Sequence, residues 1–155
     1  ALQSDTVRAQ LNCDGLHIHP AALRILCRAL GEDRTIVISD AMRAAGQADG
    51  PSELGGQPVF VKDGQARLAD GTLAGSTANL HQELKNLVAF GVPLRQAVKS
   101  VSLNPARALR EEGRVGSLAP GKLADFVALD AQSLDIRFVV KDGRLAVKEG
   151  VLLEP

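Results

Sequence analysis

The spacing of apolar residues predicts a strand, a helix and a second strand at the start of the chain. Apolar and polar residues alternate over residues 8–13, which indicates a short, half-buried strand. An i, i+3, i+4, i+7 apolar stripe then predicts a helix over residues 20–30, and Gly31 is a natural stop for that helix. The β-branched run at residues 35–39 is typical of a strand buried on both faces, as in a parallel sheet covered by helices. We therefore expect a strand–helix–strand unit of an α/β fold.

Turn-forming residues mark the next part of the chain. Glycine, alanine and proline are frequent over residues 41–58, which predicts a long loop, and long loops in compact domains often carry function. A hairpin over residues 58–69 follows, because an Asp-Gly pair supplies a two-residue turn between apolar runs. Small residues at 71–77 then precede a helix. Ser76 or Thr77 is expected to cap that helix, although backbone N–H groups at such a site can also hold an oxygen-rich ligand.

Helical periodicity returns over residues 78–90 and 93–102. The predicted apolar faces are Leu80, Leu84, Leu87 and Val88 in the first helix and Leu94, Ala97, Val98 and Val101 in the second. A third, short helix is expected to begin with Asn104 as its N-cap and Pro105 as its first helical residue.

The last third of the chain has a different pattern. Short apolar runs over residues 113–155 are separated by pairs that contain glycine, which predicts a series of short strands. We therefore expect two regions, residues 1–112 with mixed helices and strands, and residues 113–155 with strands alone.

Composition narrows the choice of partners. The chain has 155 residues, with 18 Lys and Arg against 18 Asp and Glu, so its charge gives no reason to expect nucleic acid or an anionic membrane as partner. No apolar run approaches the roughly 18 residues of a membrane-spanning helix. The only two cysteines, Cys13 and Cys27, lie in apolar surroundings and are expected to be buried thiols of a cytoplasmic protein, with a disulfide as the alternative.

Asp40 is the strongest candidate for chemistry, because it directly follows a buried strand. In barrels of alternating strands and helices, the carboxyl ends of the strands carry the catalytic residues. Asp40 could equally cap a turn or pair with Arg43, and its position alone does not decide between these roles. His17 and His19 share one face of an extended segment, but two ligands do not fill a metal site, so capping or packing is favoured. His81 is expected on a helix surface.

Four motifs, in this order, resemble those of the N-acetylglucosamine-6-phosphate deacetylase family. They are DGLHIHP at residues 14–20, VISDAM at 37–42, GTLAGS at 71–76 and GSLAPGKLAD at 116–125. The first and third are the motifs most specific to that family, whereas many amidohydrolases share the last.

The resemblance implies a fold and a set of site residues. Residues 1–112 would be the last strands and helices of a (β/α)8 TIM barrel, and residues 113–155 would be the C-terminal strands of a small β-sandwich domain. His17 would follow the seventh barrel strand and Asp40 the eighth, and Asp40 would act as general base toward a metal-bound water. The implied substrate-binding residues are Asp14, Gly15, Leu16, His17, Leu73, Ala74 and Gly75.

The implied activity is metal-dependent hydrolysis of N-acetylglucosamine 6-phosphate to glucosamine 6-phosphate and acetate. The divalent metal, zinc in this expectation, would take its ligands from the N-terminal part of the same enzyme, because the chain has no suitable ligand set of its own. The chain alone is therefore expected not to deacetylate, and the enzyme is expected to be a homodimer. The alternatives are another amidohydrolase, such as a cyclic amidase or a deaminase, or a non-catalytic remnant that serves as a binding module.

Overall fold

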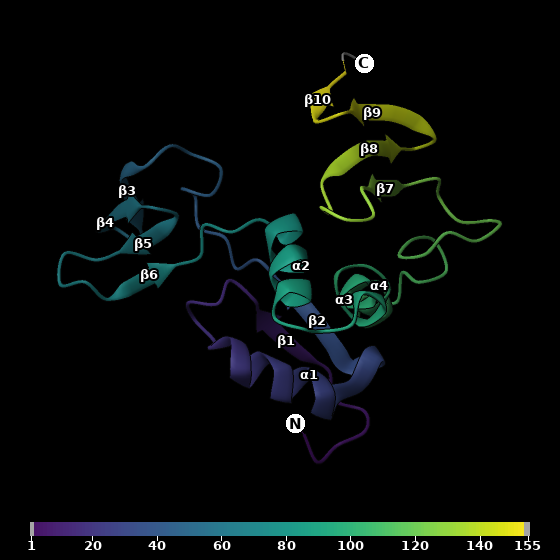
Figure 1. The fold of residues 1–155 in the computed structure, drawn as a ribbon, viewed down its shortest axis with the longest axis horizontal. Coiled ribbons are helices and arrows are strands. Elements are labelled where there is room, and N and C mark those ends of the chain that lie inside the picture. The colour runs from purple at the N-terminus through teal and green to yellow at the C-terminus, as the bar shows by residue number, and fades with distance from the viewer. Residues whose placement is uncertain (1, 154–155) are drawn as a thin grey trace. The chain divides into compact units, whose positions relative to one another are not determined.

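The structure, a computed structural model, describes residues 2–153 (Figure 1). The chain forms two compact units that divide after Asn104. This division lies before the expected boundary between residues 112 and 113, which stays a prediction.

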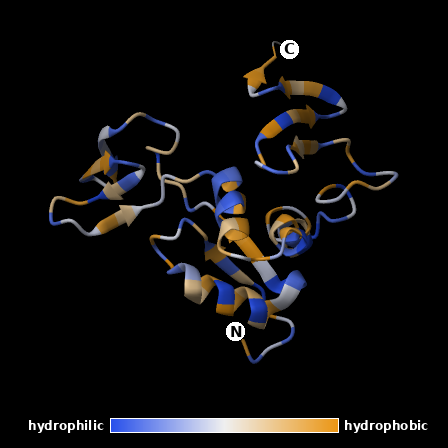
Figure 2. Ribbon diagram, in the orientation of Figure 1, coloured by the Kyte–Doolittle hydropathy of each residue, from blue (hydrophilic) through white to orange (hydrophobic). Residues whose placement is uncertain are grey.

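The strand–helix–strand unit predicted for the start of the chain is present. Strands β1 (Ala9–Asn12) and β2 (Thr35–Ile38) pair in parallel, and helix α1 (Pro20–Arg34) connects them. A parallel pair needs such a crossover, because the chain must return to the end of the sheet from which it started. The first three residues of β2 are buried, and Figure 2 shows that this strand is hydrophobic. The expectation of a buried strand is confirmed.

The apolar stripe of α1 packs as its spacing predicts. Leu23, Cys27 and Leu30 are at most 3% exposed. The helical backbone breaks at Gly31, which has φ of +69°, and the element continues for one further turn to Arg34. Glycine suits this break because it has no Cβ to oppose a positive φ.

Four strands form an antiparallel sheet in the middle of the chain, in the order β3-β4-β5-β6. Their bounds are β3 (Gly50–Leu54), β4 (Gln57–Lys62), β5 (Gln65–Arg67) and β6 (Leu73–Gly75). The predicted hairpin is formed by β4 and β5. Residues of these strands and of the segment before β3 form a small core, which consists of Met42, Ala44, Val59, Val61 and Ala66.

Two segments in this region form strands that the sequence did not predict. Residues 50–54 lie in the predicted loop at 41–58 but form β3, because they pair with β4 along the whole strand, from Gly50 opposite Val61 to Leu54 opposite Gln57. Part of the small-residue segment at 71–77 is strand β6, which pairs with β5.

Helix α2 (Leu80–Ala89) begins later than predicted. Its N-cap is Asn79, whose side-chain oxygen accepts the N–H of Gln82 at 2.8 Å. The predicted caps Ser76 and Thr77 are wrong, because other contacts engage them. The Ser76 hydroxyl accepts the N–H of Ala78 at 3.2 Å, before the helix begins, and the Thr77 hydroxyl donates to the Gly64 carbonyl at 2.5 Å.

The buried faces of the helices also differ from the prediction. In α2, Glu83 is buried together with Leu84 and Leu87, whereas Leu80 is 41% exposed. Helix α3 (Leu94–Val101) buries Gln96, Ala97 and Ser100. Leu94 and Val98, expected in the core, are exposed. The Gln96 amide explains this orientation, because it donates to the carbonyls of Cys27 at 2.8 Å and Gly31 at 3.0 Å.

Asn104 is not the N-cap that its pairing with proline suggested. It lies within helix α4 (Leu103–Ala108) and is fully buried. Its side-chain nitrogen donates to the carbonyls of Glu32 and Thr35, each at 2.8 Å, so it joins the end of α1 to the start of β2.

The second unit contains a four-stranded antiparallel sheet in the order β10-β9-β8-β7. Its strands are β7 (Phe126–Leu129), β8 (Ile136–Lys141), β9 (Arg144–Lys148) and β10 (Val151–Leu152). The strands predicted for the end of the chain are therefore present.

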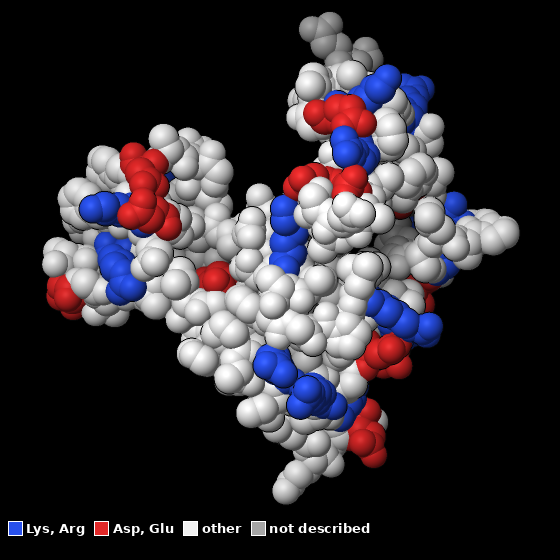
Figure 3. Space-filling model, in the orientation of Figure 1, with Lys and Arg blue, Asp and Glu red and all other residues white. Residues whose placement is uncertain are grey.

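Two surface properties bear on possible partners. Basic and acidic side chains are interspersed on the face shown in Figure 3. In the described part of the chain, no helix combines the length and the hydropathy needed to cross a membrane.

Candidate active site

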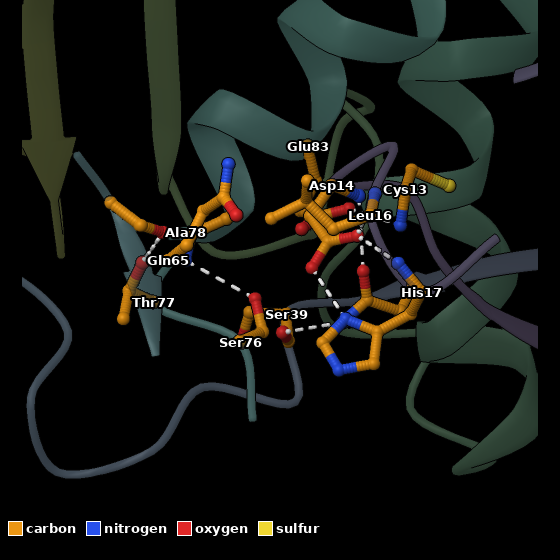
Figure 4. A network of polar contacts seen from close by, with 12 residues as sticks. Cys13, Asp14, Leu16, His17, Ser39, Gln65, Ser76, Thr77, Ala78 and Glu83 are labelled. Carbon is orange, nitrogen blue, oxygen red and sulfur yellow. Dashed lines mark hydrogen bonds and ion pairs between the residues drawn. The ribbon is translucent and has the colours of Figure 1, made fainter. Parts of the chain in front are cut away.

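A tight turn directly after β1 places Asp14 and His17 side by side (Figure 4). One carboxylate oxygen of Asp14 accepts the N–H groups of Leu16 at 2.8 Å and His17 at 3.0 Å, and the other lies 2.6 Å from Nδ1 of His17. An ionised carboxylate only accepts hydrogen bonds, so Nδ1 of His17 carries a proton and donates it to Asp14. The turn therefore presents a histidine of defined orientation.

The contacts of Asp14 keep its carboxyl group ionised. Burial by itself would raise the pKa of Asp14, since only 6% of its side chain is exposed. The backbone N–H groups of His17 and Leu16, together with the His17 ring, outweigh burial and hold the pKa of Asp14 below its usual value.

Asn12 connects this turn to the end of the neighbouring strand. Its side-chain oxygen accepts the N–H of Asp14 at 3.0 Å, and its side-chain nitrogen donates to the carbonyl of Ser39 at 3.2 Å. Ser39 immediately precedes Asp40. The loops that carry the two predicted site motifs are thus held at the same end of the parallel pair.

Asp40 is exposed to solvent and has φ of +46°. A non-glycine residue in this region of backbone conformation is uncommon, although aspartate tolerates it better than most. The segment that follows bonds to the end of β6, where Ala41 and Ser76 form a parallel bridge. Hydrogen bonds therefore link three segments of the chain. Asn12 joins the segment of Asp14–His17 to that of Asp40, and the bond from the Met42 N–H to the Ser76 carbonyl joins the segment of Asp40 to that of Leu73–Gly75.

Glu83 is a buried carboxyl group beside this site that was not among the predicted residues. It is 0% exposed, and Oε2 accepts the N–H of Cys13 (Figure 4). Oε1 is buried and has no hydrogen-bond partner among the described residues. Burial raises the pKa of Glu83 to about 7; the Cys13 N–H opposes this rise and the charge of Asp14 adds to it. The signal in the sequence is its helical spacing, which places Glu83 on the face that contains Leu84 and Leu87.

The other histidines lie outside this turn. Nδ1 of His19 accepts the N–H of Ala21 at 3.2 Å and caps α1, which confirms the capping role favoured for this residue. His81 is half-buried on α2.

Within residues 2–153, no group of three or more His, Cys, Asp or Glu side chains is placed to hold a metal ion. The described residues alone therefore do not fit a complete metal site.

A pocket of about 520 Å³ adjoins the turn. Asp14 and Leu16 form one side of it, and Asn79, Gln82 and Asn86 of α2 form another. Its described lining contains no Lys or Arg, so it offers hydrogen bonds but no positive charge. This pocket suits a polar, uncharged group better than a phosphate.

Comparison with known proteins places these features in context. The model of the amidohydrolase family matches residues 14–146. The N-acetylgalactosamine-6-phosphate deacetylase of Escherichia coli is 42% identical over 138 residues, which are 88% of this chain and 36% of that protein.

Two solved structures are also similar. N-acetylglucosamine-6-phosphate deacetylase from Thermotoga maritima superimposes with a TM-score of 0.88 at 34% identity, over 96% of this chain and 40% of that one. A mutant of N-acetyl-D-glucosamine-6-phosphate deacetylase from Mycobacterium smegmatis, in complex with N-acetyl-D-glucosamine-6-phosphate, has a TM-score of 0.84 at 37% identity, over 93% of this chain and 39% of that one. The chain spans well under half the length of these three proteins.

Proposed function

The chain belongs to the amidohydrolase family, and from this premise we propose that it forms the C-terminal part of an N-acetylglucosamine-6-phosphate deacetylase. The reaction is hydrolysis of the N-acetyl group to give glucosamine 6-phosphate and acetate. One observation carries the proposal: the Asp14–His17 turn and Asp40 follow adjacent parallel strands at the same end, and Asn12 joins them. In strand–helix barrels this end is where catalytic residues lie.

The proposed setting of these strands is a (β/α)8 barrel. In it β1 and β2 are the seventh and eighth strands, residues 1–112 belong to the barrel, and residues 113–155 belong to a small β-sandwich domain. The likeness to the Thermotoga maritima enzyme supports this assignment.

In the proposed mechanism Asp40 is the general base. It takes a proton from the water whose oxygen attacks the acetamide carbonyl carbon, and it passes that proton to the nitrogen as the C–N bond breaks. Its exposure lets water and substrate reach the carboxylate. His17, oriented by Asp14, offers Nε2 for a hydrogen bond with a sugar hydroxyl, and Gly15, Leu16 and Leu73–Gly75 line the substrate.

A divalent ion, zinc, belongs to the same proposal. The described residues do not supply a complete set of ligands, so we assign it no step in the reaction. We propose that its ligands, and the positive charge that binds the phosphate, come from the N-terminal part of the same enzyme.

A homodimer and a cytoplasmic location are proposed as well. The two buried free thiols, Cys13 and Cys27, fit a reducing compartment.

N-acetylgalactosamine 6-phosphate is a second candidate substrate. The specific observation in its favour is the 42% identity to the Escherichia coli enzyme that is named for this sugar. The two sugars differ only in the configuration at C4, so the same hydrolytic groups serve either one.

An assay of acetate release tests the proposed function. The chain is fused behind the part of the Escherichia coli relative that precedes the matched region. The folded fusion is given both sugar phosphates, a cyclic amide as substrate for a cyclic amidase, and an amino-substituted ring as substrate for a deaminase. We expect acetate from at least one sugar phosphate. Turnover of the cyclic amide, or release of ammonia, with no acetate would favour another amidohydrolase. No turnover by a folded fusion would favour a binding module. The chain alone is expected to stay at the rate of a buffer blank.

A further inference from the structure

We propose that Glu83 and Asn86 of α2 are positioning residues that hold the Asp14–His17 turn in place for the substrate. The inference rests on the proposed function, in which this turn lines the sugar site. Neither residue is assigned to contact the substrate; both act through the backbone of Cys13.

Cys13, the residue immediately before the turn, is held on both of its peptide groups by α2. Its N–H donates to Oε2 of Glu83, and its carbonyl accepts the side-chain nitrogen of Asn86 at 3.1 Å. The two side chains are three residues apart, so they project from the same face of the helix. Beyond Asn12 the backbone has left its pairing with β2, and α2 supplies the partners that a neighbouring strand would otherwise provide.

Burial makes these contacts strong. Glu83 and Cys13 are each 0% exposed, so water does not compete for the hydrogen bond between them. A buried carboxyl group costs stability unless it satisfies a polar partner. An unpaired N–H at Cys13 would also be costly in this position. The pairing of these two groups explains why a glutamate is buried on the same helix face as Leu84 and Leu87.

The same anchor fixes the direction of the turn. Asp14 follows Cys13, and its N–H is held by Asn12, which also reaches the carbonyl of Ser39 before Asp40. The remaining hydrogen bonds of the turn are internal, from Leu16 and His17 to the Asp14 carboxylate. Loss of the α2 contacts would therefore free both peptide groups of Cys13 on their α2 side and leave the start of the turn held by the side chain of Asn12.

Amide hydrogen exchange at Leu16 and His17, measured by NMR on the chain, tests this inference. In Glu83→Leu we expect these two amides to exchange about tenfold faster, because one buried hydrogen bond is lost next to the turn. In Glu83→Gln, which keeps an acceptor for the Cys13 N–H, exchange should stay within about twofold of wild type. Asn86→Leu should speed exchange at Leu16 and His17 as Glu83→Leu does. If Glu83→Leu fails to fold, Asn86→Leu is the variant that is compared with wild type.

Leu84→Ala is the control, because it removes buried contacts from the same helix without touching Cys13. Exchange at Leu16 and His17 that is no faster in Glu83→Leu than in Leu84→Ala would overturn the inference. Exchange in Glu83→Gln as fast as in Glu83→Leu would also overturn it.

Addition of N-acetylglucosamine 6-phosphate to the labelled fusion enzyme, which also holds the N-terminal part, separates this inference from the proposed function. We expect the amide signals of Leu16 and His17 to shift with ligand in wild type and to lose that shift in Glu83→Leu. Absence of a shift in wild type contradicts the proposed substrate site, and with it the purpose of the positioning. Equal shifts in wild type and Glu83→Leu, with unchanged exchange, contradict only the role of α2.

Discussion

At the scale of single residues, two independent constraints require glycine at position 15. Its φ is +78°, and a Cβ placed there would lie 2.9 Å from Cζ of Phe90. Gly46 has a similar φ of +75° but open space around it. Gly46→Ala should therefore cost only the backbone strain, about 1 kcal/mol, whereas Gly15→Ala should cost at least about 1 kcal/mol more. Urea unfolding of the two variants measures the difference, and equal losses would show that Phe90 moves away without cost.

The candidate site was predictable to the extent that it depends on position along the chain. Asp40 and the Asp14–His17 turn each follow a strand, and strand ends can be located from apolar spacing. The bond between Asp14 and His17 and the link through Asn12 depend on side-chain directions that spacing does not specify. Glu83 escaped prediction for a similar reason, because a glutamate on a helix is usually exposed and only the partner at Cys13 makes its burial favourable.

At the scale of elements, the buried glutamate of α2 should make the stability of the chain depend on pH. The folded-state pKa of Glu83 is raised from 4.5 to about 7, so the folded chain binds this proton more tightly than the unfolded chain does. Its contribution is fully present below about pH 4.5 and is lost as pH rises to about 7. The lowered pKa of Asp14 acts in a separate window at lower pH. We expect the free energy of unfolding to fall by on the order of 3 kcal/mol across the Glu83 window.

Glu83→Gln isolates this effect, since the amide does not titrate. Urea unfolding at about pH 5 and about pH 8 should show a smaller loss of stability in the variant than in wild type. Equal losses in both proteins would mean that another group controls the dependence.

Elements with a regular apolar period were predictable, and elements whose residues lack such a period were not. The strand–helix–strand unit follows from periodicity alone. The frequency of glycine, alanine and proline over residues 41–58 predicts a loop, yet β3 forms there at the edge of its sheet, where proline is tolerated. Local sequence favours a capping role for Asn104, but its amide donates to one carbonyl near the end of α1 and one at the start of β2, and these two bonds override the local preference.

At the scale of the whole molecule, the two units differ in how deeply their strands are buried. None of the described residues of β7, β8, β9 or β10 is buried, whereas β2 is buried over its first three residues. Backbone hydrogen bonds open more readily where few apolar contacts cover them. We therefore expect amide protection in β7–β10 to be at least about tenfold lower than in β1, α1 and β2. Hydrogen exchange followed by mass spectrometry measures this, and equal protection in both units would contradict it.

The central claim is that Asp40 accepts the proton in deacetylation of an amino-sugar phosphate. The most direct measurement is acetate release by the fusion enzyme with Asp40→Asn, beside Asp142→Asn as a control. Asp142 is also an exposed aspartate with positive φ, at +50°, but it lies in the second unit. Asparagine tolerates the same backbone conformation, so both variants should fold. The account predicts that Asp40→Asn lowers the rate by about a hundredfold or more while Asp142→Asn leaves it unchanged; a folded Asp40→Asn enzyme with the wild-type rate would contradict it.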